Sequence, residues 1–454
     1  MNERDIHGKL VLVLGLGRSG IAACRLCHKQ GARVIGMDRR GAGELNGAVE
    51  DLRRGGIEII LENDQRTEPI DLLVCSPGIP FAHPTIQWCR QLDIPVVSEI
   101  ELASWYCPGT LVAVTGTDGK STVVSLVHQI LRDQDRPARL VGNIGNPFSG
   151  MLVDNPPDAS TICVIEVSSY QLALIRDFHP HVAAILNVAA DHLDHHGSFQ
   201  DYARAKYRIT LNQTPDDFLI RPLVLPDTFQ SRAETLFWAD QPHELPGVQF
   251  DPRNGKVTTR LAETMHSYFF QTLSRLMPHQ RQNLLAALAI CLPFQLDLKK
   301  AMQTMLAFPG LPHRLEYLGK WHGINYYNDS KATNVHACKA ALEGLEGPLI
   351  LLAGGLPKQE DYSQLLELLK RKTKRVLVFG PARELLEKAW GKDLGLTSVA
   401  SLEQATRLAV DWAEPGDTVL LSPACASQDR FQDFEQRGNF FKSLISEWVI
   451  EKPS

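Results

Sequence analysis

The sequence predicts an α/β protein with three domains, each a mostly parallel sheet flanked by helices. Short runs rich in Val, Ile and Leu, typical of strands buried on both faces, alternate with helical stretches along the chain. Two of these runs lead directly into glycine-rich loops that precede a helix. The length of 454 residues suits about three domains of roughly 150 residues each.

The composition excludes several classes of protein. The chain has 47 Lys and Arg against 52 Asp and Glu, a net charge of −5, which argues against a general nucleic-acid-binding surface. Nine cysteines form an odd number spread thinly over a long chain, so we expect a reducing compartment rather than a disulfide framework. No apolar run approaches the ~20 residues of a membrane span, and no targeting segment is visible. We therefore expect a soluble, cytoplasmic protein.

The first domain is predicted over residues 1–98. A strand at Leu10 to Leu14 is followed by a helix, and a second strand ends at Asp38. The loop between the first strand and the helix has the GxGxxG spacing of a dinucleotide-binding fingerprint, at Gly15, Gly17 and Gly20. NAD, FAD or a UDP-sugar would each satisfy this pattern, and a purely structural tight turn is a further alternative.

The second domain is predicted over residues 99–309, and its main motif is GTDGKST at 116–122. Backbone N–H groups of such a loop can surround a phosphate, and the helix that follows adds its partial positive charge. Lys120 would reach the β- and γ-phosphates, while Ser121 or Thr122 would hold Mg²⁺. The strict P-loop spacing fails, because Val114 stands where the first glycine should be. ATP binding is favoured over a simple glycine turn.

Polar residues follow two later strands of this domain. Glu166 ends a strand in IEVSSYQL and could bind Mg²⁺, although a strand-end glutamate can equally be a surface charge. The loop ADHLDHHG could form a zinc-hydrolase site, supply one histidine to a second divalent ion, or be a solvated polar loop. By its own spacing, Lys206 on the next helix would be a solvated surface residue. Residues 212–277 show no recognisable pattern.

The third domain is predicted over residues 310–454. The heptapeptide NDSKATN follows a strand, and its Asp329 and Lys331 could bridge a nucleotide and a transferred phosphoryl group, or form an ordinary polar turn. The block SPACASQDRFQDFEQRG follows another strand, and its small residues and hydroxyls could line a pocket for a carboxylate-bearing substrate. Phe434 in this block is by default a core residue.

These motifs together resemble the Mur ligases of bacterial peptidoglycan synthesis, in the branch that adds D-glutamate. They occur in order along nearly the whole chain, as GLGRSG, SPGI, TGTDGKST, GNIGNP, EVSSYQL, DHLDHHG, GLPHR, NDSKATN and the SPACAS block. The resemblance implies Rossmann-like first and third domains and a central P-loop ATPase-like domain. It also implies an ATP-dependent ligase that joins D-glutamate to UDP-N-acetylmuramoyl-L-alanine through an acyl phosphate, working as a monomer with two Mg²⁺ ions and no nucleic-acid partner.

The resemblance assigns site residues by their positions in these motifs. The UDP-substrate site falls on Arg18, Ser19, Asp38, Arg39, Ser76, Gly78, Asn143, Ser168 and Gln171. The ATP site falls on Gly116, Thr117, Asp118, Gly119, Lys120, Ser121, Thr122, Asn283, His313, Arg314 and Asp329. The D-glutamate pocket falls on Lys331, Thr333, Lys358, Ser427 and Phe434. The metal ligands would be Ser121 and Glu166 for a first Mg²⁺ ion, and His192 with a carbamoylated Lys206 for a second. The catalytic residues would be Lys120, Lys206, Lys331 and His192. His192 is our own candidate for the general base, because the ammonium group of D-glutamate must lose a proton before it attacks.

The sequence departs from the family pattern in four places. His279 to Asn283 reads HQRQN where HNxxN is usual, and Ala190 replaces an acidic residue. His195 stands where arginine is common, and LLAGGLPK has Leu356 in place of the usual aspartate. Two alternatives therefore stay open: a ligase similar to folylpolyglutamate synthase, which should lack a UDP-binding first domain, and a nucleotide-sensing regulatory protein without turnover.

Overall fold

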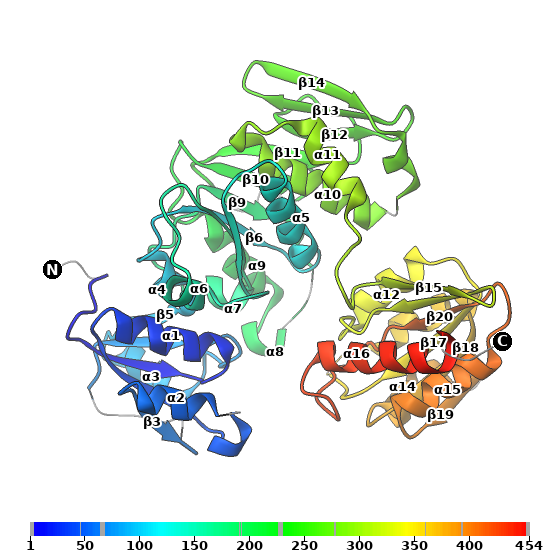
Figure 1. Ribbon diagram of the computed structural model, residues 1–454, viewed down its shortest axis with the longest axis horizontal. Coiled ribbons are helices and arrows are strands. Elements are labelled where there is room, and N and C mark those ends of the chain that lie inside the picture. The colour runs from blue at the N-terminus through cyan, green and yellow to red at the C-terminus, as the bar shows by residue number, and fades with distance from the viewer. Residues whose placement is uncertain are drawn as a thin grey trace. The chain divides into compact units, whose positions relative to one another are not determined.

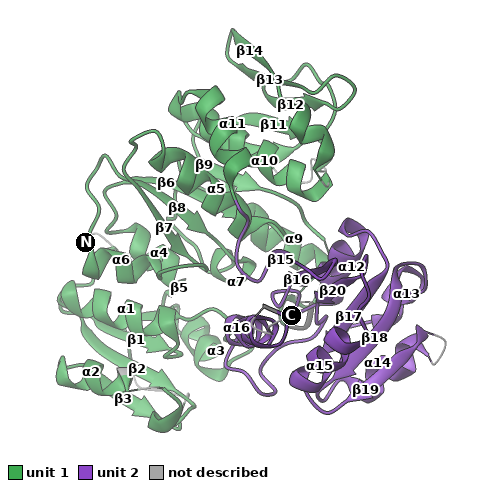
Figure 2. Cartoon of the chain, turned by 45° about the vertical axis from the view of Figure 1, so that its right-hand side comes forward, with its two compact units in different colours: residues 1–308 green, residues 309–454 purple. Residues whose placement is uncertain are grey.

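The structure is a computed structural model (Figure 1). It describes residues 4–45, 47–63, 69–189, 191, 193–225, 230–276, 278–358, 360–391 and 394–450. The chain forms two compact units, residues 1–308 and 309–454 (Figure 2). The α/β class and the three mostly parallel sheets are confirmed. No helix in the described ranges has both the length and the apolar character needed to cross a membrane.

The first sheet of the larger unit has five parallel strands in the order β3-β2-β1-β4-β5. Its strands are β1 (Leu10–Leu14), β2 (Arg33–Asp38), β3 (Glu58–Leu61), β4 (Leu72–Cys75) and β5 (Val96–Ser98). Its helices are α1 (Arg18–Lys29), η1 (Ala42–Glu44), α2 (Ala48–Arg54), α3 (Pro84–Gln91) and α4 (Glu99–Ser104). The strand order reverses direction at β1 and β4, and ligands of parallel α/β sheets bind in the crevice at such a point.

The second sheet has nine strands in the order β14-β13-β12-β11-β10-β9-β6-β8-β7, and only β13 and β14 run antiparallel to their neighbours. Its strands are β6 (Thr110–Thr115), β7 (Ala138–Gly142), β8 (Ile162–Glu166), β9 (Val182–Ile185), β10 (Phe218–Pro222), β11 (Glu234–Ala239), β12 (Gly247–Asp251), β13 (Lys256–Leu261) and β14 (Thr264–Phe269). Its helices are α5 (Lys120–Arg132), α6 (Phe148–Asp154), α7 (Ser169–Leu172), α8 (Leu193–His196), α9 (Phe199–Tyr207), η2 (Arg208–Thr210), η3 (Gln271–Arg275), α10 (Pro278–Cys291), η4 (Leu292–Phe294) and α11 (Leu298–Ala307).

The first two sheets share one hydrophobic core within the larger unit. Helix α1 packs against α6, so apolar side chains of both sheets form a single buried cluster. At the edge of this contact, Arg25 forms an ion pair with Asp154, and the Lys29 ammonium donates a hydrogen bond of 3.0 Å to the Leu152 carbonyl. The packing fixes the glycine-rich loop of the first sheet relative to the second sheet.

The smaller unit has six strands in the order β15-β16-β20-β17-β18-β19, all parallel except the edge strand β15. Its strands are β15 (Glu316–Trp321), β16 (Ile324–Asn328), β17 (Leu349–Gly354), β18 (Thr373–Phe379), β19 (Leu396–Val399) and β20 (Thr418–Leu421). Its helices are α12 (Val335–Gly344), η5 (Tyr362–Leu365), α13 (Leu366–Lys372), α14 (Arg383–Trp390), α15 (Leu402–Trp412), α16 (Phe434–Ile445) and the π-helical turn η7 (Ser446–Ile450). Helices on both faces bury β17 and β20 completely, as their apolar sequences predict.

Candidate active site

The glycine-rich loop after β6 is shaped by two close approaches of asparagine side chains. The Asn187 Oδ1 atom accepts hydrogen bonds of 2.9 Å from the backbone N–H groups of Thr117 and Asp118. Gly119 precedes α5 with φ +82°, and a Cβ atom there would lie 2.4 Å from Asn283 Oδ1. Only glycine fits this position without strain or clash. The structure therefore brings Asn283, 164 positions further along the chain, to the loop as the resemblance implies.

Lys120 is folded back onto its own loop. Its ammonium donates to the carbonyl oxygens of Gly116 at 2.7 Å and Thr117 at 2.8 Å. These are weak acceptors compared with a phosphate oxygen, which would bear a full or partial negative charge. The Lys120 ammonium thus lies beside the loop, where a bound anion could replace these carbonyl oxygens as its hydrogen-bond acceptor.

Glu166 lies beside the loop in a buried hydrogen-bonded chain. The Ser121 hydroxyl donates to Glu166 Oε2 at 2.6 Å, and the Asn143 amide donates to Oε1 at 2.8 Å. Ser121 and Glu166 are each 2% exposed. A carboxylate and a hydroxyl at the start of α5 form the kind of oxygen donor set that binds Mg²⁺ next to nucleotide phosphates. The two residues assigned to the first metal ion are therefore in contact.

Lys206 is buried, contrary to what its spacing alone predicts. It is 2% exposed, its ammonium donates to the Gly116 carbonyl at 2.7 Å, and it lies 4.5 Å from the centre of the Tyr202 ring. Burial lowers the pKa of Lys206 well below its usual value, and the charge of Lys120 lowers it further. The solvated-surface interpretation was wrong because a distant segment, the phosphate loop, covers this face of α9.

The histidine loop divides into residues with different surroundings. His195 hydrogen-bonds through Nε2 to the Ile79 carbonyl, and its ring contacts Phe81 at 4.5 Å and Tyr170 at 4.2 Å. His196 lies 3.0 Å from the Ser169 hydroxyl. His192, assigned to the second metal ion, lies outside the described residues. Within the part of the chain that is described, no group of three or more His, Cys, Asp or Glu side chains is placed to hold a metal ion.

The carboxyl end of the first sheet holds a second group of assigned residues. Asp38 is buried, accepts the Leu16 N–H at 2.6 Å and is bound by the Arg40 guanidinium at 2.7 and 3.0 Å. Although burial raises the pKa of the Asp38 carboxyl, these hydrogen bonds outweigh it and hold the pKa below its usual value. The Ser76 hydroxyl donates to the Gly15 carbonyl at 2.6 Å. These groups surround the turn at which the strand order reverses.

A hydrogen bond connects this first-sheet site to the phosphate loop. The Arg18 guanidinium, at the start of α1, donates to the Gly145 carbonyl. Asn143, two residues earlier in that turn, binds Glu166, which in turn binds Ser121. One continuous row of groups therefore runs from the glycine-rich turn of the first sheet to the phosphate loop of the second.

Two of the residues assigned to the UDP substrate have local partners. The Ser168 hydroxyl accepts the backbone N–H of Gln171 at 3.3 Å, and the Gln171 side chain accepts the backbone N–H of Ser168 at 3.0 Å. This reciprocal pair caps the N-terminus of α7. This cap holds the segment after Glu166 in place.

In the smaller unit, Asp329 lies at the carboxyl end of β16. It accepts the Leu315 N–H at 3.0 Å and the Ser422 hydroxyl at 2.8 Å, and burial raises its pKa to about 7. His313 lies nearby, with Nδ1 2.9 Å from the Asn328 amide nitrogen. Asp329 and His313, both assigned to ATP, therefore lie at the end of one strand.

The residues assigned to D-glutamate come from neighbouring loops of the same unit. The Lys331 ammonium lies 3.7 Å from the centre of the Phe434 ring. Backbone hydrogen bonds of 2.9 Å join Leu356 and Ala426 in both directions, which places the loop that carries Lys358 beside Ser427. The buried Ser427 hydroxyl has no hydrogen-bond partner within the described residues. A polar atom left in this state suits a ligand with an acceptor oxygen.

Known proteins are similar to this chain over nearly its whole length. A UDP-N-acetylmuramoylalanine–D-glutamate ligase of Chlorobium luteolum is 38% identical, over 98% of this chain and 99% of the relative. The enzymes of the same name from Koribacter versatilis and Listeria innocua are 37% and 34% identical, each over at least 97% of both chains. The chain belongs to the Mur ligase family. Three models of that family match it: the MurD-like N-terminal domain at residues 9–98, the Mur ligase middle domain at 114–291 and the glutamate ligase domain at 313–425.

Solved structures show that the Mur ligase fold extends over the whole chain. MurF of Thermotoga maritima, in complex with ADP, matches with a TM-score of 0.59 at 16% identity, over 98% of this chain and 97% of MurF. MurC of the same organism matches with a TM-score of 0.57 at 17% identity, over 97% and 100%. FolC of E. coli also shares the fold, with a TM-score of 0.58 at 17% identity, over 82% of this chain and 99% of FolC. Fold alone therefore does not separate the two ligase alternatives, whereas the match of the MurD-like N-terminal domain does.

Several residues of this Mur ligase that shape the site were missed in the sequence. Asn187 binds the phosphate loop, Arg40 binds Asp38, and Tyr202 lies under Lys206. Arg437 is fully buried and donates to the Ser330 carbonyl at 2.8 Å, so it holds the NDSKATN loop. Asn187 follows a buried strand directly, which is a signal that could have identified it; the other three depend on contacts that only the fold reveals.

Proposed function

We propose that this chain joins D-glutamate to UDP-N-acetylmuramoyl-L-alanine in an ATP-dependent reaction that releases ADP and phosphate. Full-length similarity to ligases of that name, at 34–38% identity, supports the substrates. The observation that carries the mechanism is the continuous row from Arg18 through Asn143 and Glu166 to Ser121. A sugar nucleotide bound at the first sheet could extend along this row until its terminal carboxylate meets the γ-phosphate.

We assign one substrate to each proposed domain. Residues 1–98 would bind the UDP substrate, residues 99–309 ATP, and residues 310–454 D-glutamate. The assigned residues in each domain are those that the family resemblance implies, and Arg40 and Asn187 join them because of their contacts with Asp38 and the phosphate loop. We further propose that the protein works in the cytoplasm, because ATP and UDP-linked precursors are cytoplasmic compounds, and that it is a monomer, as the family resemblance implies.

The first magnesium site would be formed by Ser121 and Glu166, whose oxygens already lie 2.6 Å apart in a buried setting. Mg²⁺ in such a site neutralises phosphate charge and orients the γ-phosphoryl group. Ser121 would bind the ion through its hydroxyl oxygen, and Glu166 would bind it through its carboxylate. Asn143 would keep the other carboxylate oxygen in place.

A carbamate on Lys206 would provide an anion for a second magnesium ion. The lowered pKa favours the neutral amine, which is the form that attacks CO₂. A bond forms between Nζ of the neutral amine and the carbon of CO₂, one N–H proton is released, and the uncharged amine becomes a carbamate anion. This anion would attract the Lys120 ammonium, which a protonated Lys206 would repel. We keep His192 as the proposed partner ligand and general base.

Activation of the substrate carboxylate is the step that consumes ATP. A carboxylate oxygen attacks the γ-phosphorus, ADP leaves, and the acyl phosphate then reacts with the amine of D-glutamate, releasing phosphate and a proton. The crowded negative charge would be stabilised by Lys120, Arg314 and Lys331, since positioning and electrostatics dominate phosphoryl transfer. Ser427 would donate to a carboxylate of D-glutamate.

The test is phosphate release with UDP-N-acetylmuramoyl-L-alanine and each of D-glutamate, L-glutamate and meso-diaminopimelate. We expect release with D-glutamate alone, loss of release in Lys120→Ala, and no change in the control Lys299→Ala, an exposed lysine of the same domain. Equal release with all three amino acids would contradict the proposed specificity. Release with none would favour a nucleotide sensor without turnover.

A further inference from the structure

The larger unit has a cavity that is lined by none of the residues assigned to the substrates. It is open to solvent, has a volume of about 840 Å³, and is lined by residues of α9, η2, β10, β11 and the segment that leads into β11. This volume falls in the range of small-molecule sites. Arg204 and Arg208 are four positions apart and share one side of α9 and its continuation, whereas Lys206 lies between them on the other side. The cavity therefore shares a wall with the helix that carries Lys206.

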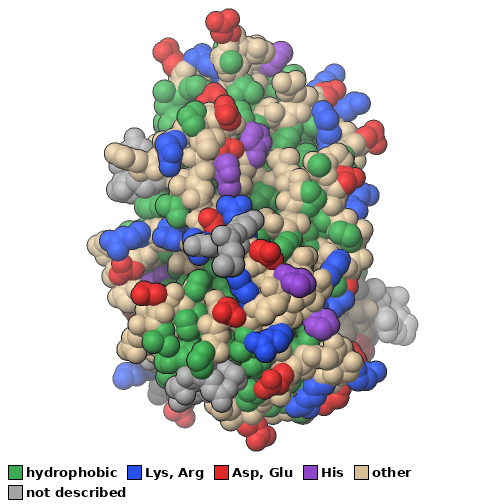
Figure 3. Space-filling model, turned by 90° about the vertical axis from the view of Figure 1, so that its left-hand side faces the viewer, with side chains coloured by type: hydrophobic (Ala, Val, Ile, Leu, Met, Phe, Trp, Pro, Cys, Tyr) green, Lys and Arg blue, Asp and Glu red, His purple; other side chains and the backbone are tan. Residues whose placement is uncertain are grey.

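The walls of this cavity are strongly basic. Four arginines line it, Arg204, Arg208, Arg221 and Arg232. No Asp or Glu occurs among its described lining residues, although the exposed Arg204 also forms a 3.0 Å ion pair with Asp201 at the rim. On the face shown in Figure 3 the charges are mixed, with Lys and Arg interspersed among Asp and Glu. Four guanidinium groups in one hollow are thus unusual in a chain of net charge −5.

The sheet fixes the floor of the cavity. Arg221 of β10 pairs in register with Phe237 of β11, and its guanidinium stacks 5.7 Å from the centre of that ring. Arg221 is 4% exposed and also donates to the Leu225 carbonyl. Leu219 and Thr235 pair two residues earlier on the same face and supply an apolar and a hydroxyl surface. This floor is preorganised, because side chains and strand register both hold it.

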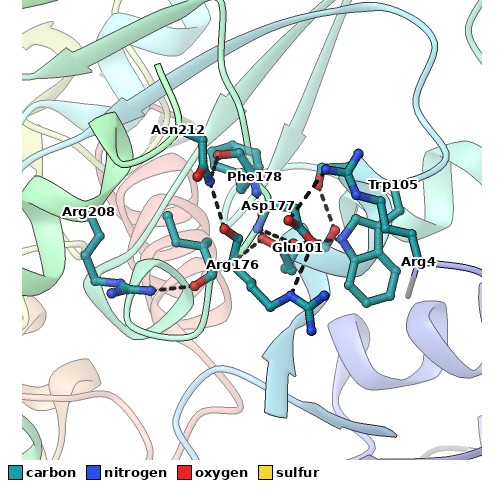
Figure 4. A network of polar contacts seen from close by, with 10 residues as sticks. Arg4, Glu101, Trp105, Arg176, Asp177, Phe178, Arg208 and Asn212 are labelled. Atoms are coloured by element: carbon teal, nitrogen blue, oxygen red, sulfur yellow. Dashed lines mark hydrogen bonds and ion pairs between the residues drawn. The ribbon is translucent and has the colours of Figure 1, made fainter. Parts of the chain in front are cut away.

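Arg208 connects the cavity to the segment that follows Glu166. Its guanidinium donates to the carbonyls of Leu172, the last residue of α7, at 3.0 Å, and Ile175, three residues further on. The next three backbone N–H groups bind the buried Glu101 carboxylate, at 2.7 to 2.9 Å (Figure 4). A ligand that engages Arg208 would therefore act on two elements of the proposed active site, α9 and α7.

We infer that this cavity binds a phosphorylated small molecule with more than one phosphate group, as a regulatory site separate from ATP and substrate. Guanidinium groups match phosphate oxygens in charge and in paired hydrogen-bond geometry. Hydroxyls of Ser231 and Thr235 add donors, while Leu219 accommodates an organic part. Such a ligand would hold α9 in one position. Because α9 carries Lys206, the contacts of Lys206 with the phosphate loop would then change.

The test is titration calorimetry of the full chain with inorganic tripolyphosphate. All proteins carry Lys120→Ala, which weakens binding at the phosphate loop. We expect one binding event that becomes at least tenfold weaker in Arg204→Glu/Arg232→Glu, two exposed positions. The control is Lys299→Glu/Lys300→Glu, an exposed pair in the same domain with the same change of charge, and it should bind as the parent does.

Hydrogen exchange provides an independent readout that does not depend on catalysis. Tripolyphosphate should slow amide exchange at 204–211 and 172–178 in the parent and in the lysine control, but not in the arginine variant. No binding to the parent, or equal loss in both double variants, would overturn the inference. Flotation with phosphatidylglycerol vesicles through these arginines, without tripolyphosphate binding, would also overturn it, because the cavity would then serve a lipid headgroup.

Discussion

Lys120 and Lys206 donate hydrogen bonds to the same atom, the carbonyl oxygen of Gly116, each at 2.7 Å. Two ammonium groups on one acceptor repel each other, and the buried one bears the larger cost of charge. Burial and Lys120 together lower the pKa of Lys206. The arrangement therefore favours the neutral form of the Lys206 amine beside the phosphate loop, and this chemistry supports the proposed carbamate.

Lys206→Ala is expected to lose most ligase activity, by roughly 100-fold or more, because the proposed anion beside the phosphates is missing. Added acetate or another small carboxylate should restore part of the rate, since it can occupy the vacated space. Steady-state phosphate release checks both effects. Lys299→Ala is the control for the loss of a lysine as such. Activity of Lys206→Ala equal to that of the parent would exclude the carbamate.

Glu166→Gln is expected to raise the Mg²⁺ concentration needed for half-maximal activity and to lower the maximal rate, each by roughly 10- to 100-fold. The amide keeps the shape of the side chain but removes the charge that would bind the metal. Titration of activity with Mg²⁺ checks this. The exposed Glu58→Gln is the matched control. An unchanged Mg²⁺ dependence would move the metal site away from Glu166.

Gly119→Ala is expected to weaken ATP binding and to destabilise the protein more than Gly56→Ala does. Both glycines have nearly the same positive φ, +82° and +84°, so both substitutions carry the strain of about 1–2 kcal/mol. Only at Gly119 would the new Cβ also meet Asn283 Oδ1, at 2.4 Å, whereas the nearest atom at Gly56 is 3.9 Å away. Chemical denaturation and nucleotide titration measure the difference. Equal destabilisation by the two substitutions would show that Asn283 does not limit the space for a side chain at Gly119.

The free energy of unfolding is expected to depend on pH because of Asp329. Burial raises its pKa in the folded protein to about 7, above the unfolded value of about 3.9. Between these values the folded state retains a proton that the unfolded state has released, so this residue's contribution to stability decreases as pH rises from about 4 to 7. Relative to Asp329→Asn, the parent should therefore lose free energy of unfolding over this range. A constant difference between the two proteins, measured by urea denaturation, would contradict the raised pKa.

Local sequence signals predicted the parts of the fold in which a buried strand meets a glycine loop. β1 and β6 are completely or almost completely buried and lead into the turns at Gly15 and Gly116, as expected. Residues 212–277 gave no pattern, yet they form β10 to β14. The reason is visible in β14, TMHSYF, which is almost entirely exposed and so lacks an apolar face.

Contacts between distant segments account for what the sequence could not predict about the site. The burial of Lys206 depends on Gly116, 90 residues earlier, and no periodicity of α9 contains that information. Leu356 departs from the family pattern, but its backbone pairing with Ala426 needs no particular side chain. Arg437 resembles a surface charge in sequence, and only the packing of α16 shows that it is fully buried.

The central claim is that ATP activates the carboxylate of the UDP-linked substrate for attack by D-glutamate. Mass spectrometry of the released phosphate, with ¹⁸O in the alanyl carboxylate of UDP-N-acetylmuramoyl-L-alanine, tests it most directly. If an acyl phosphate forms, the oxygen that attacks phosphorus leaves with the phosphate, so the phosphate should carry one ¹⁸O and the amide product should retain the other. Amide product accompanied by phosphate without ¹⁸O would contradict the claim.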